Sequence, residues 1–159
     1  MSKICCFTGS RDIKEIDPKK IFSELEKVLI GLIENEDYID FRAGGAVGFD
    51  TIAAFCVLEL KKRYPNIKLH LMLPCKNQEK YFDAKERQFY ETILERADSH
   101  IYIQEQYTDG VMFKRNRALV DGSDLCVALL LKSYGGTYHT VRYAKRKGVE
   151  VRNIANLIK

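Results

Sequence analysis

Three apolar runs of this chain each stop at a loop that contains glycine, and a helical pattern follows each loop. The runs are Ile4–Phe7, Tyr38–Phe41 and Leu125–Leu131. Short apolar runs of this kind are typical of strands buried on both faces of a parallel sheet. Parallel strands need a crossover connection, which is usually a helix and is nearly always right-handed. The chain is therefore expected to fold as a series of βαβ units.

The spacing of apolar residues predicts strands that alternate with helices along the whole chain. The strands are expected at residues 4–7, 38–41, 67–73, 101–103, 125–131 and 149–151, and the helices at 18–33, 50–63, 77–98, 112–120 and 138–147, with a short terminal segment at 154–158. Asp17 and Pro18 provide the N-cap and the first position of the first helix. This alternation predicts an α/β fold, namely a doubly wound, mostly parallel, Rossmann-like three-layer sandwich.

Chain length and composition fit a single domain that spans residues 1–159. A chain of 159 residues can bury a core without disulfides or structural metal ions. No low-complexity stretch or run of like charges marks a linker. The formal net charge of +4 fits an anionic ligand. Because basic and acidic residues are mixed along the predicted helices, charge by itself does not indicate a nucleic-acid partner.

The five cysteines lie inside or just beyond apolar runs, and their spacing is not that of a metal site. We therefore expect reduced, mostly buried thiols and no bound metal. The N-terminus lacks the pattern of a signal peptide, and the longest apolar run is too short to cross a bilayer. A cytoplasmic protein without a membrane partner is the expectation.

The first two glycine-bearing loops have the composition of loops that bind phosphate. They contain Thr8, Gly9, Ser10 and Arg11 after the first strand, and Gly44, Gly45 and Ala46 before the second helix, with Asp50 in the first turn of that helix. Glycine allows a positive φ and a close approach of the backbone to a ligand, and the N-terminus of a helix favours an anion. Arg11 can add a bidentate contact to phosphate, although a surface ion pair is the alternative. For Asp50, holding the loop takes precedence over binding a ribose hydroxyl.

Two later segments extend this candidate site. The first turns of a later helix are expected to contain Arg115, Asn116 and Arg117. Positive charge is unfavourable near the N-terminus of a helix, so a nearby anion would compensate for it. Arg117 is the leading candidate of the three for binding that anion. The residues after the fifth strand offer backbone donors and one hydroxyl; they are Gly135, Gly136 and Thr137. Doubly wound sheets bind ligands beyond the carboxyl ends of their strands, so all three glycine-bearing loops are expected at one edge of the sheet.

In this order, the four segments resemble the YpsA-like branch of the SLOG superfamily, which also contains the DNA-processing protein DprA and the LOG phosphoribohydrolases. The resemblance covers nearly the whole chain, and it includes the segments 120–124 and 140–144 that follow the last two motifs. It implies a Rossmann-like fold whose loops bind a nucleotide or a nucleotide-derived ligand. It implies no other cofactor and no settled reaction.

The chain departs from the Pro-Gly-Gly-x-Gly-Thr-x-x-Glu pattern of the LOG enzymes. Tyr134 stands at the position of the proline, the third glycine is absent, and the helix continues with Val141, Arg142 and Tyr143 instead of the glutamate. In LOG enzymes that glutamate takes part in breaking the glycosidic bond. An arginine cannot replace a carboxylate that activates water or stabilises an oxocarbenium-like centre. The sequence therefore leaves open whether this chain is an enzyme.

Three functions remain as alternatives. The leading one is a binding or sensing module for a nucleotide or nucleotide sugar, with the phosphates held by the glycine loops. The second is a nucleoside 5′-monophosphate phosphoribohydrolase. The third is a DprA-like module for single-stranded nucleic acid, for which Tyr107, Phe113, Tyr134 and Tyr138 offer stacking faces. The sequence identifies neither base nor sugar, and it leaves assembly into a homo-oligomer open.

Overall fold

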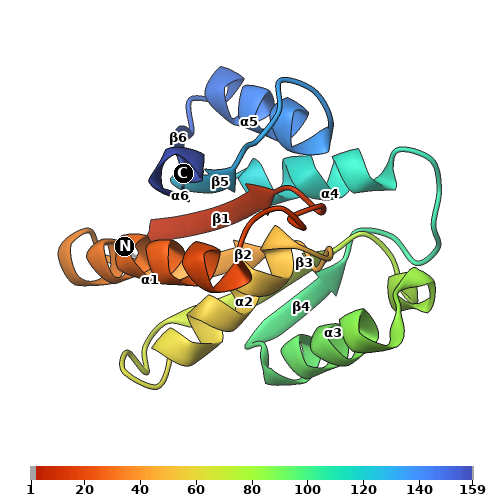
Figure 1. The fold of residues 1–159 in the computed structure, drawn as a ribbon. Helices are drawn as coiled ribbons and strands as arrows, with labels where there is room; N and C mark the ends of the chain where they lie inside the picture. Colours follow the sequence, from red (N-terminus) through yellow and green to blue (C-terminus); the bar gives the residue numbers. More distant parts are fainter. Residues whose placement is uncertain (1–2, 159) are drawn as a thin grey trace.

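The computed structural model describes residues 3–158, which form a six-stranded sheet between two layers of helices (Figure 1). The strands are β1 (Lys3–Gly9), β2 (Tyr38–Ala43), β3 (Lys68–Leu73), β4 (Ser99–Tyr102), β5 (Leu125–Leu129) and β6 (Glu150–Asn153). Their order is β4-β3-β2-β1-β5-β6, and all neighbouring strands are parallel. This confirms the predicted Rossmann-like α/β architecture.

Helices cover both faces of the sheet, which explains the continuously apolar runs in the central strands β1 and β5. The helices are α1 (Pro18–Asn35), α2 (Phe49–Leu60), α3 (Ala84–Arg96), α4 (Val111–Val120), α5 (Gly136–Arg146) and α6 (Ala155–Ile158), together with the 3₁₀ turn η1 (Gln78–Tyr81). One layer contains α1, α2 and α3, and the other contains α4 and α5 (Figure 1). α6 packs against α1.

The direction of strand succession reverses between β1 and β5. From β1 the chain proceeds through β2 and β3 to β4 at one edge, and then returns to place β5 on the other side of β1. Gly9 and Leu129, the last residues of β1 and β5, are paired in register. The loops that follow these two strands therefore begin side by side, at the point where doubly wound sheets have their binding crevice.

Aromatic packing fixes α2 against the end of β1. The rings of Phe7 and Phe41 stack with centroids 6.1 Å apart, and the ring of Phe49 meets Phe7 edge-on at 6.4 Å. All three side chains are completely buried. Since Phe49 is the first residue of α2, this cluster places the beginning of the helix directly over the last residues of the strand.

The helix expected at residues 77–98 is interrupted, so that prediction was wrong. Asn77 has a left-handed backbone with φ 62°, the 3₁₀ turn follows, and Phe82 is extended. Asp83 then begins α3 with a capping box, because its side chain accepts from the Glu86 N–H at 2.8 Å and the Glu86 carboxylate accepts from the Asp83 N–H at 2.9 Å. The Asp-x-x-Glu pattern in the sequence indicates a helix N-terminus at this point, inside the longer stretch of apolar periodicity.

The predicted burial of the cysteines is confirmed, since all five are buried, and all five are free. Residues 3–158 contain no helix that is both long and apolar enough to span a membrane. Within the same range, no three or more His, Cys, Asp and Glu side chains gather in a way that would hold a metal ion.

The crowding around Gly9 leads to a test of the packing at the end of β1. A Cβ atom at Gly9 would overlap the ring of Phe49, whereas one at Gly31, inside α1, would meet nothing within 4 Å. We expect Gly9→Ala to lower the free energy of unfolding by about 1–3 kcal/mol through overpacking. Gly31→Ala, the matched control, is expected to raise it by up to about 1 kcal/mol through helix propensity. Urea unfolding measures both, and equal effects of the two substitutions would contradict this account of the packing.

Candidate functional site

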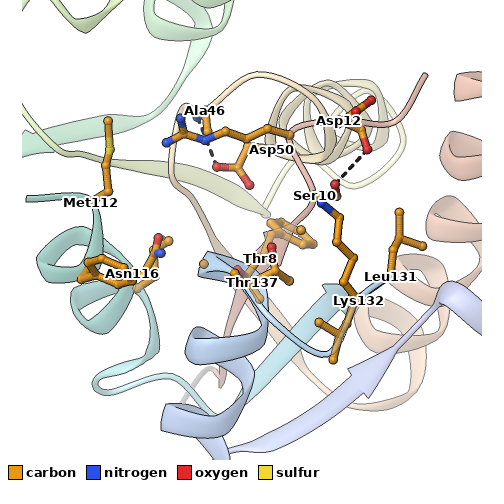
Figure 2. Close-up of a pocket in the computed structure, with 18 of the residues that line it drawn as sticks. Thr8, Ser10, Asp12, Ala46, Asp50, Met112, Asn116, Leu131, Lys132 and Thr137 are labelled. Atoms are coloured by element: carbon orange, nitrogen blue, oxygen red, sulfur yellow. Dashed lines mark hydrogen bonds between the residues drawn. The ribbon is translucent and has the colours of Figure 1, made fainter. Parts of the chain in front are cut away.

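A cavity of about 340 Å³ lies where the strand order reverses (Figure 2). We call it the switch-point cavity. Its walls come from the end of β1, the segment between β5 and α5, and one side of α4. Met112 and Asn116 project from α4 on one side, and Leu131 and Lys132 lie opposite them. Most of the site residues expected from the sequence line this cavity: Thr8, Gly9, Ser10, Arg11, Ala46, Asp50, Arg115, Asn116, Gly135, Gly136 and Thr137.

The loop after β1 is fixed to its neighbours by backbone and hydroxyl hydrogen bonds. The Ser10 N–H donates to the Leu129 carbonyl at 3.3 Å, which continues the pairing of β1 with β5. The Ser10 hydroxyl donates to the Asp12 carbonyl at 2.8 Å (Figure 2). Arg11, between these two residues, has an exposed side chain. The loop is therefore held by its backbone and by Ser10. The guanidinium group of Arg11 is left at the cavity.

The second glycine loop is joined to the first through Gly48. This residue is the N-cap of α2 and has φ 81°, and a Cβ atom there would overlap the carbonyl oxygen of Arg11. The close approach lets the Phe49 N–H donate to the Ser10 carbonyl at 3.1 Å. A donor at the N-terminus of α2 is therefore used inside the protein.

Gly44 and Gly45 do not line the cavity, because they make room for the protein's own side chains. A Cβ atom at Gly45 would overlap the side chain of Leu73. One at Gly44 would lie 2.9 Å from both the Arg115 guanidinium and the Asp50 carboxylate. The sequence indicated a close approach at these glycines, but it did not indicate what approaches them.

Asp50 and Arg115 hold the second glycine loop from inside. Asp50 accepts from the Ala46 N–H at 3.2 Å (Figure 2), and the Arg115 guanidinium donates to the Gly44 carbonyl and, at 2.8 Å, to the Asn116 side-chain oxygen. Burial raises the pKa of Asp50, and the charge of Arg115 opposes that rise. Burial likewise lowers the pKa of Arg115, with Asp50 acting in the opposite direction. This geometry favours the structural role expected for Asp50.

The position of Arg117 differs from the expectation. α4 begins at Val111 after the N-cap Gly110, which puts Arg115 in mid-helix and Arg117 in the last turn. A cation in the last turn is favoured by the helix dipole and needs no anion to offset it. Arg117 lines a neighbouring cavity of about 570 Å³ between α4 and α5, which we call the interhelix cavity, and it does not line the switch-point cavity.

The N-terminus of α5 opens onto the switch-point cavity. Its N-cap, Gly135, has φ 94° and makes no side-chain cap hydrogen bond, and Gly136 and Thr137 line the cavity. The first backbone N–H groups of a helix have no acceptor within the helix, so an anion can bind there. Lys132 and Tyr134 also line the cavity, with the ammonium group 5.2 Å from the centre of the ring. The sequence interpretation did not include Lys132, although it lies three residues before Gly135.

The family model for YpsA, described as the YspA SLOG family, matches residues 9–155. The chain belongs to this family. Among the relatives of this SLOG chain, a prophage-derived protein of Bacillus subtilis, YoqJ, is 33% identical over 139 residues, which are 80% of this chain and 81% of YoqJ. A UPF0398 protein of Bacillus cereus is 32% identical over 113 residues, which are 69% of this chain and 60% of that protein.

Solved structures of DNA processing protein A have the same fold as this SLOG chain. The Helicobacter pylori protein superposes with a TM-score of 0.65 over 94% of this chain and 63% of its own. The Streptococcus pneumoniae protein gives a TM-score of 0.66 over 94% of this chain and 49% of its own. Both are 18% identical in sequence, so the likeness is one of fold. This chain therefore spans only 63% and 49% of the lengths of those two proteins.

The buried carboxyl group of Asp50 predicts a pH dependence of stability in this SLOG chain. Because burial raises its pKa in the folded state, the folded protein keeps a proton at a pH where the unfolded chain, with a carboxyl pKa of about 3.9, has released it. The contribution to stability is therefore fully present below about pH 4 and is lost as pH rises through the folded-state pKa. Asp50→Asn removes this titration, so the stability of the wild type relative to the variant should fall as pH rises.

Urea unfolding of both proteins between about pH 4 and pH 7 measures this difference. Asp12→Asn, which changes an exposed carboxylate at the same cavity, is the control. A wild-type stability that rises with pH relative to Asp50→Asn would contradict the assignment.

Proposed function

We propose that this chain binds a nucleotide or nucleotide-derived ligand, with a phosphate group in the switch-point cavity. The observation that carries this proposal is the junction of two loops at one cavity. The loop after β1 and the segment after β5 start side by side and both line it, together with the open N-terminus of α5. Helix N-termini that follow glycine-containing loops at a switch point are recurrent phosphate sites.

The charges that line the cavity favour an anion. Arg11, Arg115 and Lys132 contribute cations, and Asp12 and Asp50 contribute carboxylates. Both carboxylates already accept hydrogen bonds from backbone N–H groups, Asp12 from Lys14 at 3.2 Å and Asp50 from Ala46 at 3.2 Å. The exposed side chains of Arg11 and Lys132 therefore supply the positive charge that a phosphate would meet.

The size of the cavity agrees with a small ligand. Its volume of about 340 Å³ is at the lower end of the range of roughly 300–1,000 Å³ for small-molecule sites. It has room for the phosphate and sugar of a nucleotide.

Because free buried thiols persist in a reducing compartment, we propose that the protein acts in the cytoplasm.

Single-stranded nucleic acid is the second candidate ligand. The DNA processing protein A of Helicobacter pylori, whose fold this chain shares, binds single-stranded DNA. In this chain Phe113 and Tyr134 both line the switch-point cavity, and their side chains are 50% and 68% exposed. Exposed rings beside a phosphate site suit bases of a strand as well as one base of a free nucleotide. This second candidate would be favoured if free nucleotide failed to displace a bound single-stranded nucleic acid.

Replacing Arg11 tests the phosphate site. Arg11→Ala is expected to weaken nucleotide binding by about 1.5–3 kcal/mol, the range for a hydrogen bond to a charged group, while the thermal midpoint stays nearly unchanged. Arg117→Ala removes the same charge from the interhelix cavity and is the matched control. Isothermal titration calorimetry with nucleoside monophosphates measures both. Equal losses would show that only net charge matters, and a loss confined to Arg117→Ala would move the phosphate to the interhelix cavity.

We expect binding without cleavage of the glycosidic bond. The position of the LOG glutamate lies on α5 after the glycines, where this chain has Thr140, Val141 and Arg142. Thr140 and Val141 are buried, and the Thr140 hydroxyl donates to the Gly136 carbonyl at 2.9 Å. Without a carboxylate there, a barrier increase of roughly 3 kcal/mol or more is expected.

Incubation with AMP, GMP, CMP and UMP, followed by an assay for ribose 5-phosphate, measures this directly. A turnover above about 1 s⁻¹, within the ordinary range of enzymes, would make the chain a hydrolase instead.

A further inference from the structure

A larger cavity continues the switch-point cavity along the same edge of the sheet. It has a volume of about 820 Å³ and shares Arg11, Ala46 and Met112 with the switch-point cavity. Its other walls come from the segment that joins β3 to α3 and from the loop between β4 and α4. We call it the side cavity.

The backbone of these two segments forms a connected wall. The Lys76 N–H donates to the Glu105 carbonyl at 3.1 Å, and the Gln104 N–H donates to the Pro74 carbonyl at 3.2 Å. Both segments follow strands that lie on the β2 side of β1. Neighbouring strands are about 4.8 Å apart, so β3 lies roughly 10 Å from β1. A nucleoside whose 5′-phosphate lies at the end of β1 can therefore reach the side cavity.

Gln78 gives this cavity a buried group that can recognise a base edge. Its side chain is only 5% exposed, and its amide nitrogen donates to the Tyr90 hydroxyl at 3.4 Å. Within residues 3–158, no hydrogen bond engages the amide oxygen of Gln78, and no fully buried side-chain polar atom lacks a partner. The amide oxygen of Gln78 is therefore not fully buried. Gln78 also lines the side cavity. An amide offers a donor and an acceptor to a planar, polar ring.

Two exposed tyrosines flank the same cavity from different segments. Tyr81, at the end of η1, is 75% exposed, and Tyr107, in the loop between β4 and α4, is 55% exposed. Large aromatic side chains at this exposure are available to stack on a base. The left-handed backbone of Asn77, with φ 62°, fixes the turn that leads into η1. A non-glycine residue in this conformation is uncommon and is often found at ligand-binding segments.

The interhelix cavity also adjoins the switch-point cavity, through Phe113 and Asn116, but its chemistry differs. Its lining includes Arg117, Arg142 and Arg146, and no carboxylate. Its tyrosine hydroxyls already have partners: the guanidinium of Arg142 donates to the Tyr138 hydroxyl at 3.1 Å, and the Tyr143 hydroxyl donates to Asp121 at 2.7 Å. These groups suit an additional anion better than a neutral base.

We infer that the side cavity is the nucleoside subsite, in which a base stacks on Tyr107 or Tyr81 and its polar edge meets the amide of Gln78. This inference rests on the proposed function, because the phosphate in the switch-point cavity fixes which part of the ligand enters the side cavity. It makes the ligand a nucleoside 5′-phosphate or a larger molecule that contains one. A sugar phosphate without a base would leave the side cavity unused and bind more weakly.

The test compares a nucleotide with its base-free fragment on the full chain. Calorimetry would measure the affinities of AMP, GMP, CMP, UMP and ribose 5-phosphate for the wild type, Tyr107→Ala, the double variant Tyr81→Ala/Tyr107→Ala, and Tyr138→Ala as the matched control in the interhelix cavity. The wild type should bind at least one nucleotide about tenfold or more tightly than ribose 5-phosphate. The double variant should lose about 5- to 100-fold for that nucleotide, the range for lost base stacking, and nothing for ribose 5-phosphate. Tyr138→Ala should change neither affinity.

Any other result contradicts either the nucleoside subsite or the proposed function. Nucleotide binding that is unchanged in the double variant, or that falls by the same factor as ribose 5-phosphate binding, overturns the nucleoside subsite and leaves the phosphate site standing. Nucleotide-specific loss in Tyr138→Ala moves the base to the interhelix cavity and also overturns it. If the wild type binds neither ribose 5-phosphate nor any of the four nucleotides, the proposed function itself fails. Because Tyr81 and Tyr107 are exposed, both variants should unfold at the wild-type temperature.

Discussion

The close approach of α2 to the end of β1 is the constraint on which the rest of the site depends. Gly9 leaves room for the ring of Phe49, and Gly48 leaves room for the Arg11 carbonyl, so the Phe49 N–H can reach the Ser10 carbonyl. The first two glycine loops are thereby joined to each other and become part of the core. Because this contact uses a donor at the start of α2, the best remaining helix N-terminus at the switch point is that of α5.

A buried pair of opposite charges completes the second loop from within. Asp50 and Arg115 are almost wholly buried, and each bonds to the backbone of residues 44–46. Removing either partner would leave a buried charge without compensation, which typically destabilises a protein strongly. The pair therefore rigidifies the loop that separates the switch-point cavity from Leu73 and the core. Preorganised walls of this kind reduce the ordering cost of binding a ligand.

Local signals in the sequence were sufficient for the fold and for placing residues 8–11 and 135–137 at one edge of the sheet. They were insufficient where the direction of a side chain or a contact between distant segments decides the outcome. Apolar strands and helical spacing predicted the doubly wound sheet, because a strand covered on both faces is apolar throughout and a helix packed on that sheet is apolar along one face. The wrong extent of the helix at 77–98 came from following periodicity past the Asp83 cap. Arg117 lines the interhelix cavity and not the switch-point cavity, because side chains of consecutive helical residues point in different directions. The side cavity was not foreseeable, because its walls meet only through strand order and through the contacts of residues 74–76 with 104–105.

The distribution of ion pairs explains why net charge alone was uninformative. In the described part of the chain, Arg152 pairs with Glu36 and Glu150, and Lys61 pairs with Asp98, all away from the switch-point cavity. Within residues 3–158, neither Arg11 nor Lys132 takes part in an ion pair. A phosphate there would not have to displace an internal carboxylate from Arg11 or Lys132, so most of its interaction with those cations would count toward binding. A modest charge of +4 spread over the whole sequence is thus compatible with exposed cations at this site, because several acids pair with lysine or arginine away from it.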